Sequence, residues 1–294
     1  MAPAEIRDGG AGMTGAATLD HVGICSADGP GLWAAMERLG FQLTPVARQS
    51  GRRSPDAPVE PLATGNRCAM LRQGYLEFLA ILDPERFDNG LGKFLARYTG
   101  MHILAFGIDD AEAELERLNR AGLAIPGIAH LERPVDDPEG PRARFSRLPL
   151  PDAPEGRLQL IQHLTPELLW QPRWLDHPNR VVALDAAILA VPQPAVTAAA
   201  LSRLTGAALE PDPAGGYALP LPQGRLRILP PDALSAVLPG VAAPALPFLA
   251  GYVVRTDDGN AAVQALLGDR LHAVPGGLMV APELAGGAAL VFAA

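Results

Sequence analysis

The stretch that decides the fold is LDHVGI at residues 19–24, together with a second stretch, GMHILAF, at residues 100–106. Each is a short apolar run that carries one histidine, which predicts a buried strand with a single polar side chain. A helix-like segment ending at glycine and three further strand-like runs follow each stretch. The order predicts two copies of a βαβββ module.

The two copies place a second polar residue at nearly the same spacing from the histidine. His21 is followed by Glu77 after 56 positions, and His102 is followed by Gln159 after 57 positions. Isolated polar residues on apolar strands are ordinary, but repetition at matched positions indicates a common role. We therefore expect these four side chains to belong to one shared site.

The expected elements follow the same order in both copies. In the first copy a polar, proline-rich segment at residues 49–64 interrupts the strands and predicts a loop. The first copy is expected to have strands at 18–26, 41–47, 67–71 and 75–82 and a helix at 31–39. The second is expected to have strands at 102–108, 128–131, 144–148 and 157–162 and a helix at 111–120.

The pattern returns twice more, in shortened form, after a connector rich in proline and tryptophan. A glycine that ends the helix lies 18 to 20 positions after the marker of the first strand in every copy, at Gly40, Gly122, Gly206 and Gly268. The sequence thus predicts an α+β protein of four βαβββ modules. The expected divisions are a tail at 1–17, an N-terminal pair at 18–165, a connector at 166–180 and a C-terminal, degenerate pair at 181–294.

Composition excludes several classes of partner. The chain of 294 residues carries a net charge of −8 and has no lysine- or arginine-rich run. Nucleic acids and anionic membranes both require a basic face, so neither is an expected partner. No apolar run reaches the roughly 18 residues of a membrane span, and the N-terminus lacks a secretory pattern. We expect a cytoplasmic protein that binds a small molecule.

Four short motifs resemble those of the vicinal-oxygen-chelate superfamily, and within it the glyoxalase-like domain branch. They are LDHV at 19–22, GFQLTP at 40–45, TGNR at 64–67 and YLE at 75–77. The superfamily includes glyoxalase I, extradiol ring-cleavage dioxygenases and bleomycin-resistance proteins. The resemblance is strong over about residues 18–180 and implies two curved mixed-sheet cups, each built from a pair of modules.

The resemblance also implies that the first and fourth strands of each module face the interior of the cup. His21, Glu77, His102 and Gln159 would then meet there as ligands of a divalent metal. Two imidazoles and a carboxylate suit zinc, iron, nickel, cobalt or manganese and leave positions open for a substrate. Gln159 is either a weaker ligand or a group that orients water or substrate. Glu77 would double as the catalytic base.

The C-terminal pair has lost polar groups at the matching positions, which are Ala186, Arg227, Ala250 and Val291. Any metal site of this design therefore belongs to the N-terminal pair. Asn66 and Arg67 sit at the start of a strand that would line its cup, and Arg48 lies at the end of another. These three residues are candidate substrate contacts.

Simpler explanations stand beside this hypothesis. Each histidine could be a hydrogen-bonded residue of the core, and Glu77 could form an ion pair with Arg67 or Arg72. The first functional hypothesis is a metal-dependent lyase or isomerase of the glyoxalase type. The second is an extradiol-type ring-cleavage dioxygenase that uses Fe(II), and the third is a non-catalytic binding or resistance protein. The chain could act as a monomer or a homodimer.

Overall fold

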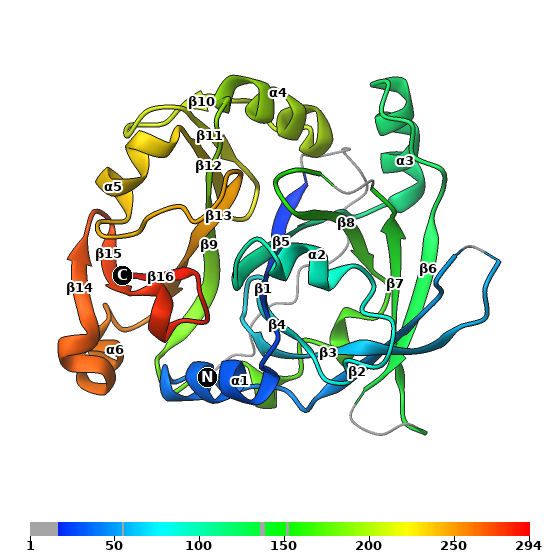
Figure 1. Cartoon of the computed structure of the whole chain (residues 1–294), viewed down its shortest axis with the longest axis horizontal. Coiled ribbons are helices and arrows are strands. Elements are labelled where there is room, and N and C mark those ends of the chain that lie inside the picture. The colour runs from blue at the N-terminus through cyan, green and yellow to red at the C-terminus, as the bar shows by residue number, and fades with distance from the viewer. Residues whose placement is uncertain (1–16, 55, 136–138, 151–152) are drawn as a thin grey trace, which may run out of the picture.

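The computed structural model describes residues 17–54, 56–135, 139–150 and 153–294. In the view of Figure 1 the N-terminal modules occupy one side of the molecule and the C-terminal modules the other. Four βαβββ modules are present in chain order, so the predicted α+β class is confirmed. The predicted tail at 1–17 lies outside the described residues except for Ala17, which is buried and donates its amide to the carbonyl of Thr205.

The N-terminal half contains modules one and two, joined by a short helix. Module one consists of β1 (Thr18–Ser26), α1 (Gly29–Arg38), β2 (Ala47–Gly51), β3 (Glu60–Met70) and β4 (Tyr75–Ile81), and α2 (Leu91–Leu95) follows it. Module two consists of β5 (Gly100–Gly107), α3 (Ala111–Arg120), β6 (Ala129–Pro134), β7 (Arg142–Leu148) and β8 (Arg157–His163). Two 3-10 turns, Pro166–Leu168 and Pro172–Trp174, lie in the connector.

The C-terminal half repeats this order with shorter strands. Module three consists of β9 (Val181–Ala190), α4 (Pro194–Thr205), β10 (Glu210–Pro211), β11 (Tyr217–Pro220) and β12 (Arg225–Leu229), followed by α5 (Leu234–Val237). Module four consists of β13 (Phe248–Thr256), α6 (Ala261–Leu267), β14 (Leu271–Val274), β15 (Gly277–Val280) and β16 (Ala289–Ala293).

In every module the first strand pairs in parallel with the fourth, and the modules join through their first strands. In the N-terminal half β1 runs antiparallel to β5, which gives the order β2-β3-β4-β1-β5-β8-β7-β6. In the C-terminal half β9 and β13 join in the same way. The two sheets meet at β5 and β13 through the pair Met101 and Leu249. We call the face of the N-terminal sheet that carries His21 and Glu77 the N-terminal cup, and its counterpart in the other half the C-terminal cup.

The opposite faces of both sheets share one apolar core. Leu76, Phe106, Tyr252 and Phe292 belong to it, as do side chains of the helices. Each of the four glycines expected to end a helix has a positive φ; Gly206, for example, has φ 75°. The positive φ, which glycine adopts readily, ends each helix; Gly206 is left-handed, whereas Gly268 begins a 3-10 turn.

The C-terminal cup is filled with apolar side chains. Ile188, Ala250 and Val291 of its strands pack there against Leu234 and Val237 of α5. Arg227 is held by two hydrogen bonds to Asp212. The loss of polar residues from this cup thus coincides with its use as a hydrophobic core.

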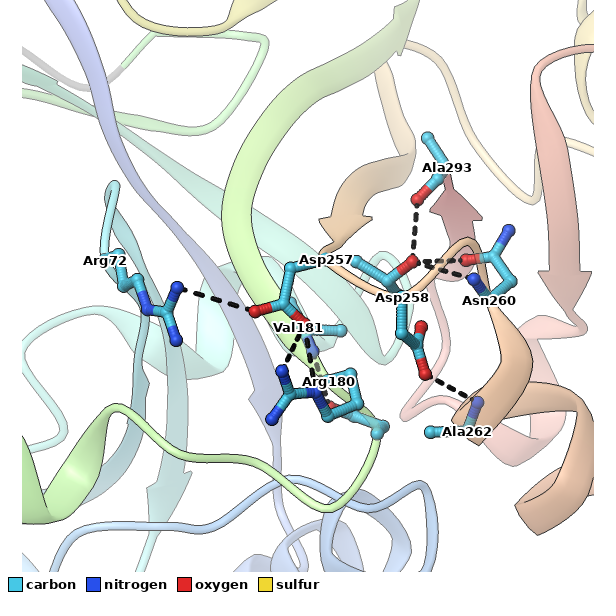
Figure 2. A network of polar contacts seen from close by, with 10 residues as sticks. Arg72, Arg180, Val181, Asp257, Asp258, Asn260, Ala262 and Ala293 are labelled. Carbon is cyan, nitrogen blue, oxygen red and sulfur yellow. Dashed lines mark hydrogen bonds and ion pairs between the residues drawn. The ribbon is translucent and has the colours of Figure 1, made fainter. Parts of the chain in front are cut away.

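A polar network fastens the two halves where β9 begins and β13 ends (Figure 2). Asp257 accepts from Arg180 at 2.9 Å and lies 3.4 Å from the guanidinium of Arg72, which belongs to module one. Beside it, the backbone amide of Asn260 donates to the hydroxyl of Thr256 at 3.0 Å. The network joins residues that are far apart in the sequence.

Two expectations about local structure were wrong. Residues 41–46 are not a strand, because β2 begins only at Ala47 and pairs with β3 through Asn66. The segment expected as a loop contributes residues to both β2 and β3, since β3 already begins at Glu60. Its polar side chains are tolerated because β2 lies at the edge of the sheet and is largely exposed. No helix in the described part of the chain is long and apolar enough to cross a membrane.

Candidate functional site

Two irregularities in the pairing of β1 with β5 decide which side chains enter the N-terminal cup. Leu19 pairs with Phe106 and His21 pairs with Ala105, so Asp20 is an extra residue on β1. On β1, Gly23 pairs with Ile103 and the next residue, Ile24, pairs with Met101. His102 is therefore an extra residue on β5. A β-bulge of this kind re-aims the side chains around it.

The first bulge brings an acidic and a basic side chain together at the floor of the cup. Asp20 Oδ1 lies 2.6 Å from His21 Nδ1, and both residues are buried. A carboxylate can only accept, so His21 Nδ1 donates to Asp20, and Nε2 is the ring nitrogen that this contact leaves unused. His21 Nε2 lies 3.9 Å from Glu77 Oε2. The Asp20 carboxylate therefore fixes the imidazole so that its basic nitrogen faces Glu77.

A second histidine shares the Asp20 carboxylate. Asp20 Oδ2 accepts from His163 Nε2 at 2.9 Å, while His163 Nδ1 is buried without a hydrogen-bond partner. Burial raises the pKa of Asp20, but the hydrogen bonds from His163 and His21 outweigh it and hold this pKa well below its usual range. Asp20 is thus ionised and bridges two imidazole rings.

The remaining contacts of Glu77 come from its own module. Asn66 Nδ2 donates to Glu77 Oε1, and Asn66 Oδ1 is buried with no partner. The ring of Tyr75 stacks on His21 with centroids 4.2 Å apart. The Glu77 and His163 side chains each keep 10% of their exposure, so a small ligand could reach the cluster through either of them. We call Asp20, His21, Asn66, Glu77 and His163 the polar cluster.

The ion pairs considered as the simpler explanation of Glu77 do not form. Arg67 lies on the opposite face of β3, where it pairs with Glu37 at 2.8 Å and donates to the carbonyl of Thr44. Arg72 pairs with Asp257 instead. Because Arg67 belongs to the helix-covered face, the structure does not bring it together with His21 and Glu77.

His102 also lies apart from the polar cluster. Its ring stacks on Tyr98 with centroids 4.0 Å apart, and Nε2 donates to the Tyr98 carbonyl at 2.8 Å. It has no contact with His21 or Glu77, and Ile103 occupies the floor of the cup opposite Gly23. Burial lowers the pKa of His102 to about 4. These contacts match the simpler explanation of His102 as a neutral histidine of the core.

Gln159 and Arg48 line two separate cavities. One, of about 450 Å³, is lined by Gln159 together with Arg147 and Arg157. The other, of about 680 Å³, is lined by exposed Arg48 and by Met70. The polar cluster lines neither of them. Across the sheet, however, Gln159 is in register with Ala105, which is in register with His21.

The sequence did not lead us to Asp20 or His163. His163 has the same parity on β8 as Gln159, so continued alternation along the strand would have placed it on the cup face. Asp20 is a charged residue inside an apolar strand, which is itself a signal of a buried polar contact. The sequence pattern marks both residues as candidates, but it does not reveal the bulge that brings them together.

The donor set fits a divalent metal in part. Two ligand atoms that share an ion at about 2.1 Å lie at most about 4.2 Å apart, and the 3.9 Å between His21 Nε2 and Glu77 Oε2 is within that span. The unpartnered Asn66 Oδ1 is a further oxygen donor beside them. Among the described residues, however, no three His, Cys, Asp or Glu side chains are grouped closely enough to hold an ion. Amide, water or substrate atoms would have to complete the coordination.

Comparison with known proteins agrees with this fold. Residues 19–205 match the glyoxalase-like domain family. The match covers more than half of the chain, which therefore belongs to this family and to the vicinal-oxygen-chelate superfamily. No curated protein matches the chain.

Solved structures show the same architecture at low sequence identity. A hypothetical protein from Staphylococcus aureus is 12% identical with a TM-score of 0.63, and the match covers 94% of this chain and 98% of that one. The 2,3-dioxygenase LapB from Pseudomonas sp. KL28 is 10% identical with a TM-score of 0.51, covering 96% and 93%. The Mn(II)-bound glyoxalase from Novosphingobium aromaticivorans is 10% identical with a TM-score of 0.51, covering 95% and 82%. At these identities the likeness concerns the fold alone.

Proposed function

We propose that the chain is a metal-dependent enzyme of the glyoxalase type, a lyase or isomerase that acts on a small oxygenated molecule in the N-terminal cup. The observation that carries the proposal is the arrangement of Asp20, His21 and Glu77. A buried carboxylate fixes one imidazole nitrogen and turns the other toward a second carboxylate 3.9 Å away. Carboxylates placed as Asp20 is, on the ring nitrogen that does not bind the ion, orient histidine ligands in many metal sites.

His21 and Glu77 are the residues that would hold the metal. When bound, a divalent ion would act as a Lewis acid that polarises a substrate carbonyl. Asn66 Oδ1 would contact the ion or the substrate, since it has no other partner. His102 is not part of this proposal, because its Nε2 is engaged by Tyr98.

The chain's own groups account for the proton transfers that such a reaction needs. Glu77 would take a proton from the carbon next to the substrate carbonyl and return it to the neighbouring atom. Asn66 Nδ2 holds Glu77 Oε1, which leaves Oε2 to face the cup and His21. Asp20 accepts from His21 Nδ1 and so orients the ring, which leaves Nε2 as the nitrogen that would bind the metal.

The same donor set argues against the dioxygenase alternative. Non-haem iron oxygenases use two histidines and one carboxylate on one face of the iron. Here one imidazole faces Glu77, while His163 is turned to Asp20 and His102 to Tyr98. The lyase or isomerase hypothesis requires only the pair that is present.

Metal binding by single variants tests the proposal. The protein would be stripped with a chelator, loaded separately with Zn²⁺, Mn²⁺, Ni²⁺, Co²⁺ and Fe²⁺, and dialysed before metal analysis. We expect one equivalent of at least one ion in the wild type and in His102→Gln, and a loss of binding in His21→Ala and Glu77→Gln. Asp20→Asn should weaken binding by about 10–100-fold, as expected for a group that orients a ligand.

Activity then separates the hypotheses. We expect the loaded protein to convert thiol adducts of 2-oxoaldehydes, and Glu77→Gln to lower the rate by about 100-fold or more. Oxygen uptake with catechols would instead favour the dioxygenase. A folded wild type that takes up none of the five metals would overturn the proposal and favour a non-catalytic binding protein.

A further inference from the structure

The cavity beside Gln159 has a pronounced positive character. Arg147, Arg157 and Lys93 line it, and Asp88 is the carboxylate among its lining residues. The two Asp88 oxygens already accept from the amides of Gly90 and Gly92, at 2.9 and 2.7 Å. The ion pairs found among the described residues involve other side chains, so none of these three cations is paired with a carboxylate. The lining of the cavity (about 450 Å³) therefore holds three cations and one carboxylate, an excess of positive charge.

Arg147 is the most unusual of these cations. Its Nε atom is buried and has no hydrogen-bond partner. Burial lowers the pKa of Arg147, and the nearby positive charge of Arg157 lowers it further. A buried, unpaired donor next to a like charge is costly. An anion bound between the two guanidinium groups would remove both costs.

Arg157 is held in position to share such an anion. Its Nη2 atom donates to the Asn89 carbonyl at 2.6 Å, and its guanidinium lies 5.6 Å from the centre of the Phe94 ring. These contacts use one N–H and one face of the group, so the other N–H groups remain available. Figure 1 shows α2, which carries Phe94, next to β8, which carries Arg157.

The cavity lies on the same face of the sheet as the polar cluster. Arg157 is in register with Ile103, which pairs with Gly23, which is in register with Glu77. Three strand spacings of about 4.8 Å separate Glu77 from Arg157 along the curved sheet. Burial raises the pKa of the Cys25 thiol, which lies on this face; Glu77 raises this pKa further, and Arg157 lowers it.

We propose that Arg147 and Arg157 form a subsite for the carboxylate of a small 2-oxo or 2-hydroxy acid, whose oxygen on the second carbon would point along the cup toward Glu77. The guanidinium fork matches a carboxylate in two parallel hydrogen bonds, which makes this chemistry the natural occupant. That the acid is the substrate rests on the proposed function. The binding of a carboxylate by the two arginines does not depend on the proposed function.

Calorimetric titration of metal-free protein with pyruvate tests the subsite. We expect saturable binding, and binding of the neutral analogue pyruvamide that is at least about 10-fold weaker, because charged hydrogen bonds contribute about 1.5–3 kcal/mol. Arg147→Gln and Arg157→Gln should each weaken pyruvate binding by at least about 10-fold. Arg144→Gln is the matched control, since Arg144 is exposed on the same strand, and it should bind like the wild type.

Several results would overturn the subsite. They are the absence of pyruvate binding to folded wild type, unchanged binding in both arginine variants, and equal binding of pyruvamide. Inorganic phosphate that binds more tightly than pyruvate at the same arginines would overturn the carboxylate assignment in favour of a phosphorylated ligand. If a Gln variant fails to fold, Arg157→Lys and Arg147→Lys keep the charge and remove the fork, and should still weaken binding.

Metal uptake measured on the same preparations keeps the two proposals separable. Pyruvate binding without uptake of any metal would leave the subsite standing and overturn the proposed function. Metal uptake by Arg147→Gln, with pyruvate binding lost, is expected if both proposals hold.

Discussion

At the scale of single residues, one of the two histidines expected in the metal site is buried as a core residue. His102 is buried, stacked on Tyr98, and hydrogen-bonded through Nε2 to the Tyr98 carbonyl. Burial lowers its pKa to about 4, so it is neutral in the folded protein at neutral pH. In the unfolded chain it has an ordinary pKa of about 6.5. The stabilisation it provides is therefore complete above pH 6.5 and is lost as the pH falls toward 4.

Because the pKa of His102 is lower in the folded protein than in the unfolded chain, the stability should depend on pH, and His102→Gln should remove that dependence. Between pH 7 and pH 4 we expect the wild type to lose about 3 kcal/mol more unfolding free energy than His102→Gln, which cannot titrate. Urea unfolding at a series of pH values measures it. His272→Gln, an exposed histidine, should follow the wild type. Parallel curves for wild type and His102→Gln would show that His102 is not a buried neutral imidazole.

At the scale of secondary-structure elements, the connector holds the end of α1 in place. Asn179 Nδ2 donates to the Leu39 carbonyl at 2.9 Å, and His177 accepts from the amide of Gln42 at 3.0 Å. Gly40, between these contacts, has a φ of 83°. A Cβ atom there would lie 2.6 Å from Leu266 and 2.9 Å from Asn179 Cβ.

Two glycines at equivalent positions allow a matched test. Gly122 ends α3 with a φ of 76°, but a Cβ atom there would meet only the Arg203 side chain, at 3.8 Å. We expect Gly122→Ala to cost about 1–2 kcal/mol, the cost of a left-handed conformation for alanine. Gly40→Ala should cost about 1–3 kcal/mol more because of overpacking. Thermal or urea unfolding measures both. Equal losses of unfolding free energy in the two variants would mean that the residues around Gly40 move to accommodate the added Cβ atom.

The same scale shows how far the sequence predicts the elements. The repeated order and the terminal glycines identified all four modules, because they depend on local backbone geometry. The edge strand β2 was missed, since its exposed polar residues have no apolar alternation to reveal it. Its strand conformation comes from pairing with β3, which is a tertiary contact.

At the scale of the whole molecule, the two halves share one core, and Tyr98 crosses between them. Its ring packs in the C-terminal cup against Phe248, with centroids 5.0 Å apart, and its hydroxyl accepts from the Leu249 amide at 3.3 Å. The apolar core on the other face of the sheets also contains residues of both halves. The halves should therefore unfold as one unit.

Calorimetry tests this coupling. We expect a single unfolding transition for the wild type, and a single transition for Tyr98→Ala that is lower by roughly 5–10 °C, corresponding to about 3–5 kcal/mol. Tyr98→Phe, which keeps the ring, should cost about 1 kcal/mol. Two resolved transitions in the wild type would show that the halves are independent domains.

The sequence by itself determined the modules, the N-terminal location of the polar residues and two members of their cluster, His21 and Glu77. These follow from periodicity and from spacing along one chain. Only the tertiary structure decided that Asp20 joins them and that His102 does not. Each is the extra residue of a bulge between β1 and β5. A strand's alternation assigns its faces only while the register with its partner is unbroken, and a bulge is a property of the pair of strands, which neither strand reveals alone.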